Sequence, residues 1–242
     1  MRKAFKASRL IGLLALALGL TAAFSATAAQ AEPGAYWLVN GADIGSSLLP
    51  SVNAKDDSLH TTLLTTVGKT PLEILCLEIS FKGAKLHELG RATGRIHYNN
   101  CVTILNKNGI AVGNCKPHSP GDAAGLILTE PLEGLIKLHK LGAGEPKEND
   151  ELLELKPVPP ATAFVKIQLG ALCAVGNEFE ITGKAFLKDC KKEGLVDLKE
   201  HLFEEGPLTE LKFGTNPATI DGSAWGFLTG VHEGMTFAGH AK

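Results

Sequence analysis

Short apolar segments, many of them alternating with polar residues, recur from residue 35 to residue 238 and are separated by turn-forming residues. Gly, Pro, Asn and Asp fill most of the gaps, where their backbone preferences favour turns. Many short strands at this spacing are typical of sandwiches and barrels. We therefore predict an all-β, disulfide-stapled fold with few or no helices, an antiparallel β-sandwich with a barrel as the alternative. The predicted strands are 35–40, 59–67, 71–81, 93–105, 110–115, 125–129, 132–141, 151–158, 163–173, 178–187, 208–213, 223–229 and 235–238.

One segment has a helical pattern. In VDLKEHLFEEG (196–206), Leu198 and Leu202, together with the preceding Leu195, fall on one face of a helix, and Gly206-Pro207 follows as a stop signal. We predict a single helix there.

The N-terminus has a basic start, an apolar run of about a dozen residues and a tail of small residues, which are the three parts of a secretory signal peptide. Ala29-Gln30-Ala31 fits the cleavage rule, so we expect a signal peptide at 1–31 and a secreted, extracellular mature chain that begins at Glu32. No later stretch is long and apolar enough for a membrane helix, so we expect no membrane span in the mature form.

The mature region, 32–242, is expected to form one β-rich domain. The alternative is two related β units, about 35–141 and 151–242, because TGRIHYNNC (93–101) is similar to TGKAFLKDC (182–190). The full chain has a net charge of −2, and loss of the basic signal peptide makes the mature chain more acidic. An acidic chain disfavours nucleic acid, so we expect no nucleic-acid partner.

The segment CVTILNKNGIAVGNC places Cys101 and Cys115 on either side of Asn108-Gly109. A three-residue hairpin loop at Lys107-Asn108-Gly109 would set Cys101 opposite Cys115, and directly opposed side chains are close enough for a disulfide after a small adjustment. An exported chain meets an environment in which such a bond persists. We therefore predict a Cys101–Cys115 disulfide.

Three further cysteines admit several pairings. We favour a Cys76–Cys173 disulfide between two apolar strands, which leaves Cys190 as the reduced thiol; Cys173–Cys190 is the alternative. An exposed Cys190 would allow a covalent homodimer.

Motifs for chemistry are weak in this sequence. No histidine pattern predicts a metal, no phosphate-binding loop occurs, and no G-x-S-x-G elbow is present. The acidic segment 145–154 is interpreted as a solvated loop. We therefore predict no catalytic residue, no metal and no cofactor, although a hydrolase triad that only tertiary geometry assembles stays open.

The aromatic residues Tyr36, Trp37 and Trp225 are the candidates for ligand contact. A sugar-binding β-domain would present such planar rings on one face. Core packing is the competing interpretation for both tryptophans.

The sequence motifs between Leu72 and Phe213 include the hairpin 101–115 and GLILTEPLEGLI (125–136). In the order of these motifs the chain resembles a group of secreted, cysteine-containing, β-rich actinobacterial proteins of unknown function. The resemblance implies an all-β secreted domain and supplies no ligand or mechanism.

These features predict a secreted non-enzymatic β-domain with a role in surface interaction or structural support. Its partner would be a cell-wall polymer or another extracellular protein. The alternatives are a carbohydrate or cell-wall-polymer binding module and an unrecognised secreted hydrolase.

Overall fold

The protein is described here by a computed structural model that covers 34–46, 48–56, 60–105, 110–139, 151–188, 190 and 210–241, with the backbone alone at 201–205. These residues belong to one compact unit, 31–242. The signal peptide 1–31, the loop 107–109 and the first half of the predicted helix lie outside the described residues.

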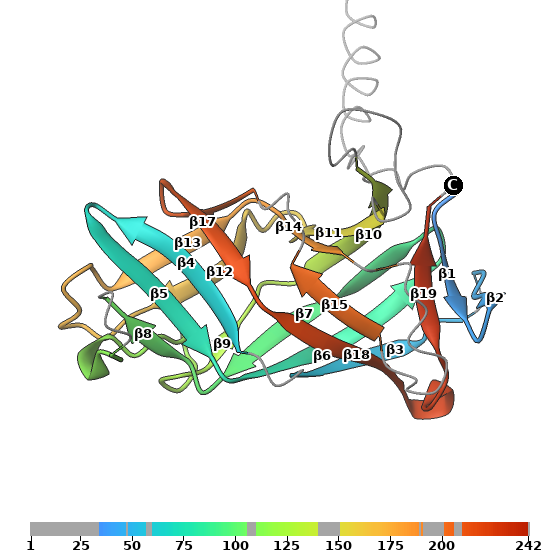
Figure 1. The fold of residues 1–242 in the computed structure, drawn as a ribbon, viewed down its shortest axis with the longest axis horizontal. Coiled ribbons are helices and arrows are strands. Elements are labelled where there is room, and N and C mark those ends of the chain that lie inside the picture. The colour runs from blue at the N-terminus through green and yellow to red at the C-terminus, as the bar shows by residue number, and fades with distance from the viewer. Residues whose placement is uncertain are drawn as a thin grey trace, which may run out of the picture. The chain divides into compact units, whose positions relative to one another are not determined.

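Antiparallel strands account for nearly all the regular structure of the described residues (Figure 1). The N-terminal strands are β1 (Tyr36–Val39), β2 (Ala42–Asp43), β3 (Ser51–Asp56), β4 (Thr61–Val67), β5 (Thr70–Cys76), β6 (Glu78–His87), β7 (Arg91–Asn99), β8 (Val102–Ile104) and β9 (Ile127–Leu128). The later strands are β10 (Leu132–Leu138), β11 (Glu151–Pro157), β12 (Ala163–Gln168), β13 (Glu178–Thr182), β14 (Ala185–Lys188), β15 (His201–Glu205), β16 (Leu211–Phe213), β17 (Asn216–Asp221), β18 (Ser223–Thr229) and β19 (Phe237–His240). Two short 3-10 turns, η1 (Gly113–Cys115) and η2 (Gly230–His232), complete the described elements.

Eight strands form a closed antiparallel ring in the order β10-β11-β14-β15-β18-β3-β6-β7. The ring closes because β7 also pairs with β10, with Ala92 opposite Gly134 and Arg91 opposite Leu135. The short strand β9 pairs with β7 beside this seam, at His97–Leu128 and Tyr98–Ile127. Closure of this kind leaves no open sheet edge within the ring.

A second sheet of seven strands has the order β12-β13-β16-β17-β4-β5-β8. Its strands continue those of the ring, because β5 passes into β6 through Leu77 alone and β17 passes into β18 through Gly222 alone. Gly222 has a φ of +152°, and a Cβ there would lie 2.9 Å from the Cα of Thr61. A larger residue at this crossing would therefore clash with β4.

The two edges of the second sheet, β8 and β12, are joined by the segment 110–119 rather than by a continuous ladder. Ala111 forms an isolated bridge with Ile104, and His118 forms another with Gln168. The second sheet is therefore a curled half-barrel whose last gap is covered by irregular chain.

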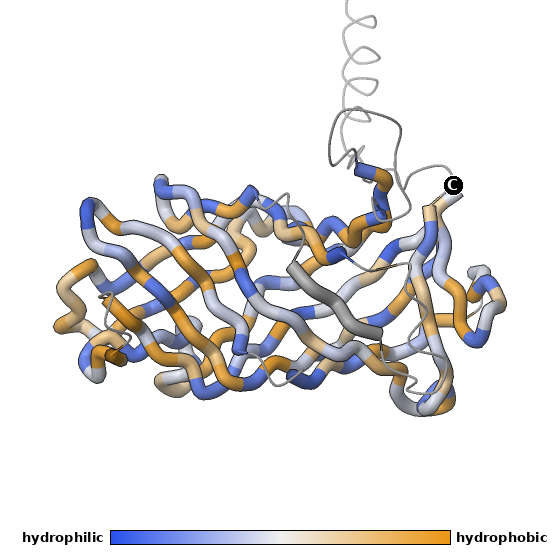
Figure 2. The backbone as a smooth tube through the Cα atoms, viewed as in Figure 1, coloured by the Kyte–Doolittle hydropathy of each residue, from blue (hydrophilic) through white to orange (hydrophobic). Residues whose placement is uncertain are grey.

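Hydrophobic and hydrophilic residues alternate along the strands (Figure 2). The inward residues of the second sheet form one core cluster, which includes Leu72, Ile74, Phe164 and Phe213. A second cluster fills the far end of the ring, where β1 and β19 contribute Trp37 and Phe237.

The all-β, antiparallel and disulfide-bonded prediction is confirmed, and the curled sheets correspond to the barrel alternative. The helix prediction is wrong at 201–205, which form β15 between β14 and β18. Ladder pairing on both sides overrides the local helical pattern there. The predicted strand 110–115 is also wrong in part, because Gly113–Cys115 forms the turn η1.

Candidate functional site

Two disulfides are present, and they join the four predicted cysteines with exchanged partners. Cys76 bonds to Cys101, and Cys115 bonds to Cys173. The predicted pairs Cys101–Cys115 and Cys76–Cys173 are therefore wrong, as is the alternative Cys173–Cys190. Disulfides indicate an oxidising environment.

The Cys76–Cys101 bond follows from the register of two neighbouring strands. Leu75 of β5 faces Val102 of β8, so the next residues outward, Cys76 and Cys101, lie directly opposite each other. Their Cα atoms are 4.0 Å apart. The same register continues in the β6–β7 ladder, where Glu78 faces Asn99. This disulfide therefore staples one long hairpin.

The predicted 101–115 hairpin has a different register from the observed one. Ile104 pairs with Ala111, and not with Val112 as a three-residue loop requires. A shift of one residue moves side chains to opposite faces. The turn η1 then takes Cys115 out of the strand and toward Cys173, in the loop after β12.

Cys190 lies outside both disulfides and is completely buried among the residues at the far end of the ring. Its Sγ lies 3.6 Å from the carbonyl oxygen of Leu187, and its own carbonyl accepts a 2.6 Å hydrogen bond from the N–H of Gly239. Because a buried thiol cannot reach a second copy, this position argues against the homodimer expected for an exposed Cys190.

The three candidate aromatics do not share a face. Trp37 is completely buried, and its Nε1 donates a 2.7 Å hydrogen bond to the carbonyl of Arg91. Tyr36, in β1, stacks on His240 with ring centroids 5.4 Å apart. Trp225 lies in β18, a strand of the ring. A single platform of these three rings is therefore absent.

Strand β18 directs its two aromatic side chains away from the interior. Ala224 and Leu228 are buried, and the alternating residues Trp225 and Phe227 are half-buried and outside both core clusters. Across the ladder, Trp225 faces Lys55 and Phe227 faces Asn53 of β3. We call Trp225 and Phe227 the outward aromatic pair. Core packing, the competing interpretation for both tryptophans, holds for Trp37.

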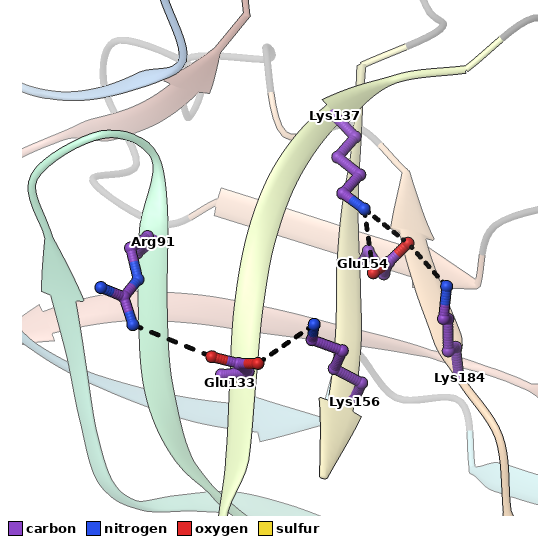
Figure 3. Close-up of polar contacts among 6 residues, drawn as sticks. All are labelled: Arg91, Glu133, Lys137, Glu154, Lys156 and Lys184. Carbon is purple, nitrogen blue, oxygen red and sulfur yellow. Dashed lines mark hydrogen bonds and ion pairs between the residues drawn. The ribbon is translucent and has the colours of Figure 1, made fainter. Parts of the chain in front are cut away.

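Charged side chains of β7, β10, β11 and the residue before β14 form ion pairs on the outward face of the ring (Figure 3). Glu154 is 3% exposed and contacts the Nζ atoms of Lys137 at 3.1 Å and Lys184 at 3.4 Å. Glu133 lies 3.1 Å from Lys156 and 3.8 Å from Arg91. The acidic segment 145–154 is therefore not wholly a solvated loop, because Glu154 is a buried ladder residue.

Two histidines near this network have pKa values below the usual 6.5. Burial is the main cause for His87, whose Nε2 is 2.8 Å from Thr93 Oγ1, and the positive charges of Arg91 and Lys85 add to it. Burial also dominates for His139, where Glu154 partly opposes the lowering of the pKa. Both histidines therefore favour the neutral form.

Three small cavities lie inside the strands. The first, about 70 Å³, is lined by Trp37, Phe81, Leu132 and Leu153 among others. The second, about 50 Å³, shares Phe81, Ile96, Leu155 and Leu187 with the first. The third, about 40 Å³, shares Thr61, Tyr98, Phe164 and Ile220 with the second. The sequence offered no signal for them, because cavities depend on which inward residues meet across the ring.

Among the described residues, no group of three or more His, Cys, Asp or Glu side chains is arranged to hold a metal ion. The same part of the chain contains no helix with the length and hydropathy needed to cross a membrane. No family model matches the chain, and no curated protein or solved structure matches it. The resemblance to secreted actinobacterial proteins therefore stays a prediction.

Proposed function

We propose that the protein is a secreted, non-enzymatic β-domain that acts by contact with another extracellular surface. The observation that carries this proposal is the outward aromatic pair, Trp225 and Phe227. Large aromatic residues normally contribute most when they are buried, and surface aromatics are enriched at interfaces. In β18, by contrast, Ala224 and Gly226 occupy the interior and the rings point outward.

Two further features support an extracellular location. Residues 1–31 have the composition of a signal peptide, with cleavage proposed between Ala31 and Glu32. The two disulfides suit a chain that works in an oxidising compartment. The closed ring of paired strands also gives the outward aromatic pair a rigid support.

A cell-wall polymer or other carbohydrate is the second candidate partner. Planar rings can stack on the apolar face of a sugar ring, and polar neighbours can bond its hydroxyl groups. On the adjacent strand β3, Lys55 lies opposite Trp225, and Asn53 lies opposite Phe227. This arrangement favours a single stacking position rather than an extended platform, since Tyr36 and Trp37 lie elsewhere.

Retention of the mature protein on washed producer cells tests the proposal. We expect the Trp225→Ala/Phe227→Ala double variant to bind about tenfold more weakly, because aromatic anchors dominate interface energies. Leu64→Ala is the matched control, because Leu64 is an outward residue of β4 that is 40% exposed. Equal retention of the double variant and wild type, or no retention of wild type, would contradict surface interaction.

Co-sedimentation with purified wall polysaccharide separates the carbohydrate candidate from a protein partner. Pelleting of wild type, and loss of pelleting in Trp225→Ala, supports the carbohydrate candidate. A panel of fluorogenic esterase and glycosidase substrates tests the hydrolase alternative. Activity that persists through purification would overturn the non-enzymatic assignment.

A further inference from the structure

The three interior cavities lie in a row. The first is bounded at one end by Trp37 and Phe237, which come from the strands that close the far end of the ring. At its other end, the first cavity shares lining residues with the second cavity. The third cavity follows the second and lies among the core residues of the second sheet. Only single layers of side chains therefore separate one cavity from the next.

Small inward residues line the first cavity. Ala84, Ala92, Gly94 and Gly134 line it, on three neighbouring strands of the ring. The interior of an eight-stranded ring is just wide enough for side chains to fill it or for one small ligand to be held. Gly94 and Gly134 are in close contact with their neighbours, since a Cβ at Gly94 would lie 2.8 Å from Ala84. The unfilled part of the interior therefore lies beside the short side chains of Ala84 and Ala92.

The chemistry of the walls excludes water from most of the row. Apolar side chains dominate all three cavities. Polar residues also border them: Lys85, Thr93 and Arg95 at the first, and Thr61 and Tyr98 at the second and third. Apolar cavities of this kind stay dry and accept apolar guests, as engineered cavities of about 150 Å³ do with benzene. The first cavity, at about 70 Å³, is too small for such a ring.

We propose that the interior of the ring binds a straight alkyl chain that runs along the row of cavities. A methylene chain is narrow enough to occupy successive small cavities where a planar ring is not. Binding requires Phe81 and Leu155, which stand between the first and second cavities, to change rotamer. Both residues are half-buried. This proposal does not depend on the outward aromatic pair.

Calorimetric titration of the mature protein with straight-chain alkanols of increasing length tests the proposal. Each added methylene group should tighten binding about fourfold until the row is filled. Hexanol should bind, and cyclohexanol, with the same number of carbons, should bind far more weakly. Equal affinity for the two, or no dependence on chain length, would overturn the proposal.

Two variants change the cavities in opposite directions. Ala92→Leu fills the first cavity and should weaken alkanol binding about tenfold. Leu155→Ala removes the partition between the first two cavities and should tighten the binding of longer alkanols. The matched control, Ala42→Leu, changes an exposed residue of β2 and should leave binding unchanged. Unaltered binding in both interior variants would overturn the assignment.

A free fatty acid and a lysophospholipid with the same chain distinguish the source of the alkyl group. Binding of both would show that the chain enters from one end with its headgroup outside. Binding of the fatty acid alone would restrict the ligand to free chains. Failure of both would contradict the proposal.

Discussion

The ring and the second sheet close in different ways. In the ring, the β7–β10 ladder completes the circle through backbone hydrogen bonds. In the second sheet, isolated bridges and the disulfide Cys115–Cys173 join the edges across the segment 110–119. The Cys115–Cys173 bond thus lies where the ladder is incomplete, and Cys190, at the far end of the ring, is outside both disulfides. The difference indicates that the second sheet depends on disulfides and the ring on pairing.

Removal of the Cys115–Cys173 bond should have the largest effect on this comparison. The bond closes a sequence separation of 58 residues, and its loss should lower the free energy of unfolding by about 4 kcal/mol. Denaturant unfolding of Cys115→Ala/Cys173→Ala measures this loss. Hydrogen exchange should rise first in β8 and β12, and faster exchange in the ring instead would contradict the comparison.

Removal of the Cys76–Cys101 bond should lower the free energy of unfolding by less than removal of the Cys115–Cys173 bond. Its separation is 25 residues, which corresponds to about 3.5 kcal/mol, and the β5–β8 and β6–β7 ladders still hold the two strands together. The Cys76→Ala/Cys101→Ala variant should therefore unfold at a higher denaturant concentration than Cys115→Ala/Cys173→Ala. The reverse order would show that the Cys76–Cys101 bond stabilises the long hairpin more than the Cys115–Cys173 bond stabilises the edges of the second sheet.

The closure seam of the ring can be weakened without any cysteine. Thr129 is completely buried, and its Oγ1 accepts a 2.9 Å hydrogen bond from the N–H of Ile96 in β7. Thr129→Val leaves that N–H without its acceptor, which should cost about 2 kcal/mol of unfolding free energy. Thr66→Val, an outward and exposed position of β4, is the control. A neutral Thr129→Val would show that the seam tolerates a lost hydrogen bond.

Acidification should produce the smallest effect, and it should act on the ring. His87 and His139 both have folded-state pKa values below 6.5, so the unfolded chain binds their protons more readily. Stability is then fully present above about pH 6.5 and falls as the pH drops toward the folded-state pKa values. Urea unfolding at two pH values measures the slope, and the His87→Gln/His139→Gln variant should flatten it. An unchanged slope would mean that other groups cause the acid sensitivity.

Most strands could be predicted from local pattern, but the two-residue strand β2 and three longer strands could not. Of the longer three, β3 and β17 contain many polar residues, and β15 has the pattern of a helix. Each pairs on both sides, β3 with β18 and β6, β17 with β16 and β4, and β15 with β14 and β18. Long-range pairing therefore stabilises these strands, although their local sequences do not predict a strand.

The sites show the same limit. The identity of the cysteines that pair was predictable from composition and the predicted signal peptide, but the partners were not. Cys76 and Cys101 meet because the β6–β7 register, which shifts between Lys82 and Lys85, continues into β5 and β8. The inward or outward direction of Trp225 depends on the register of β18 against β3. The spacing of residues along the chain predicts neither the cysteine partners nor the direction of Trp225.

By itself, the sequence determined the all-β class, the alternation of inward and outward residues, and a chemistry suited to disulfides. Only the tertiary structure decided that the sheets curl, that β7 meets β10, which cysteines are opposed, and where the interior is left unfilled. The physical reason is that hydrophobic periodicity is a local property of a strand. Partner choice and register depend on residues far apart in the chain.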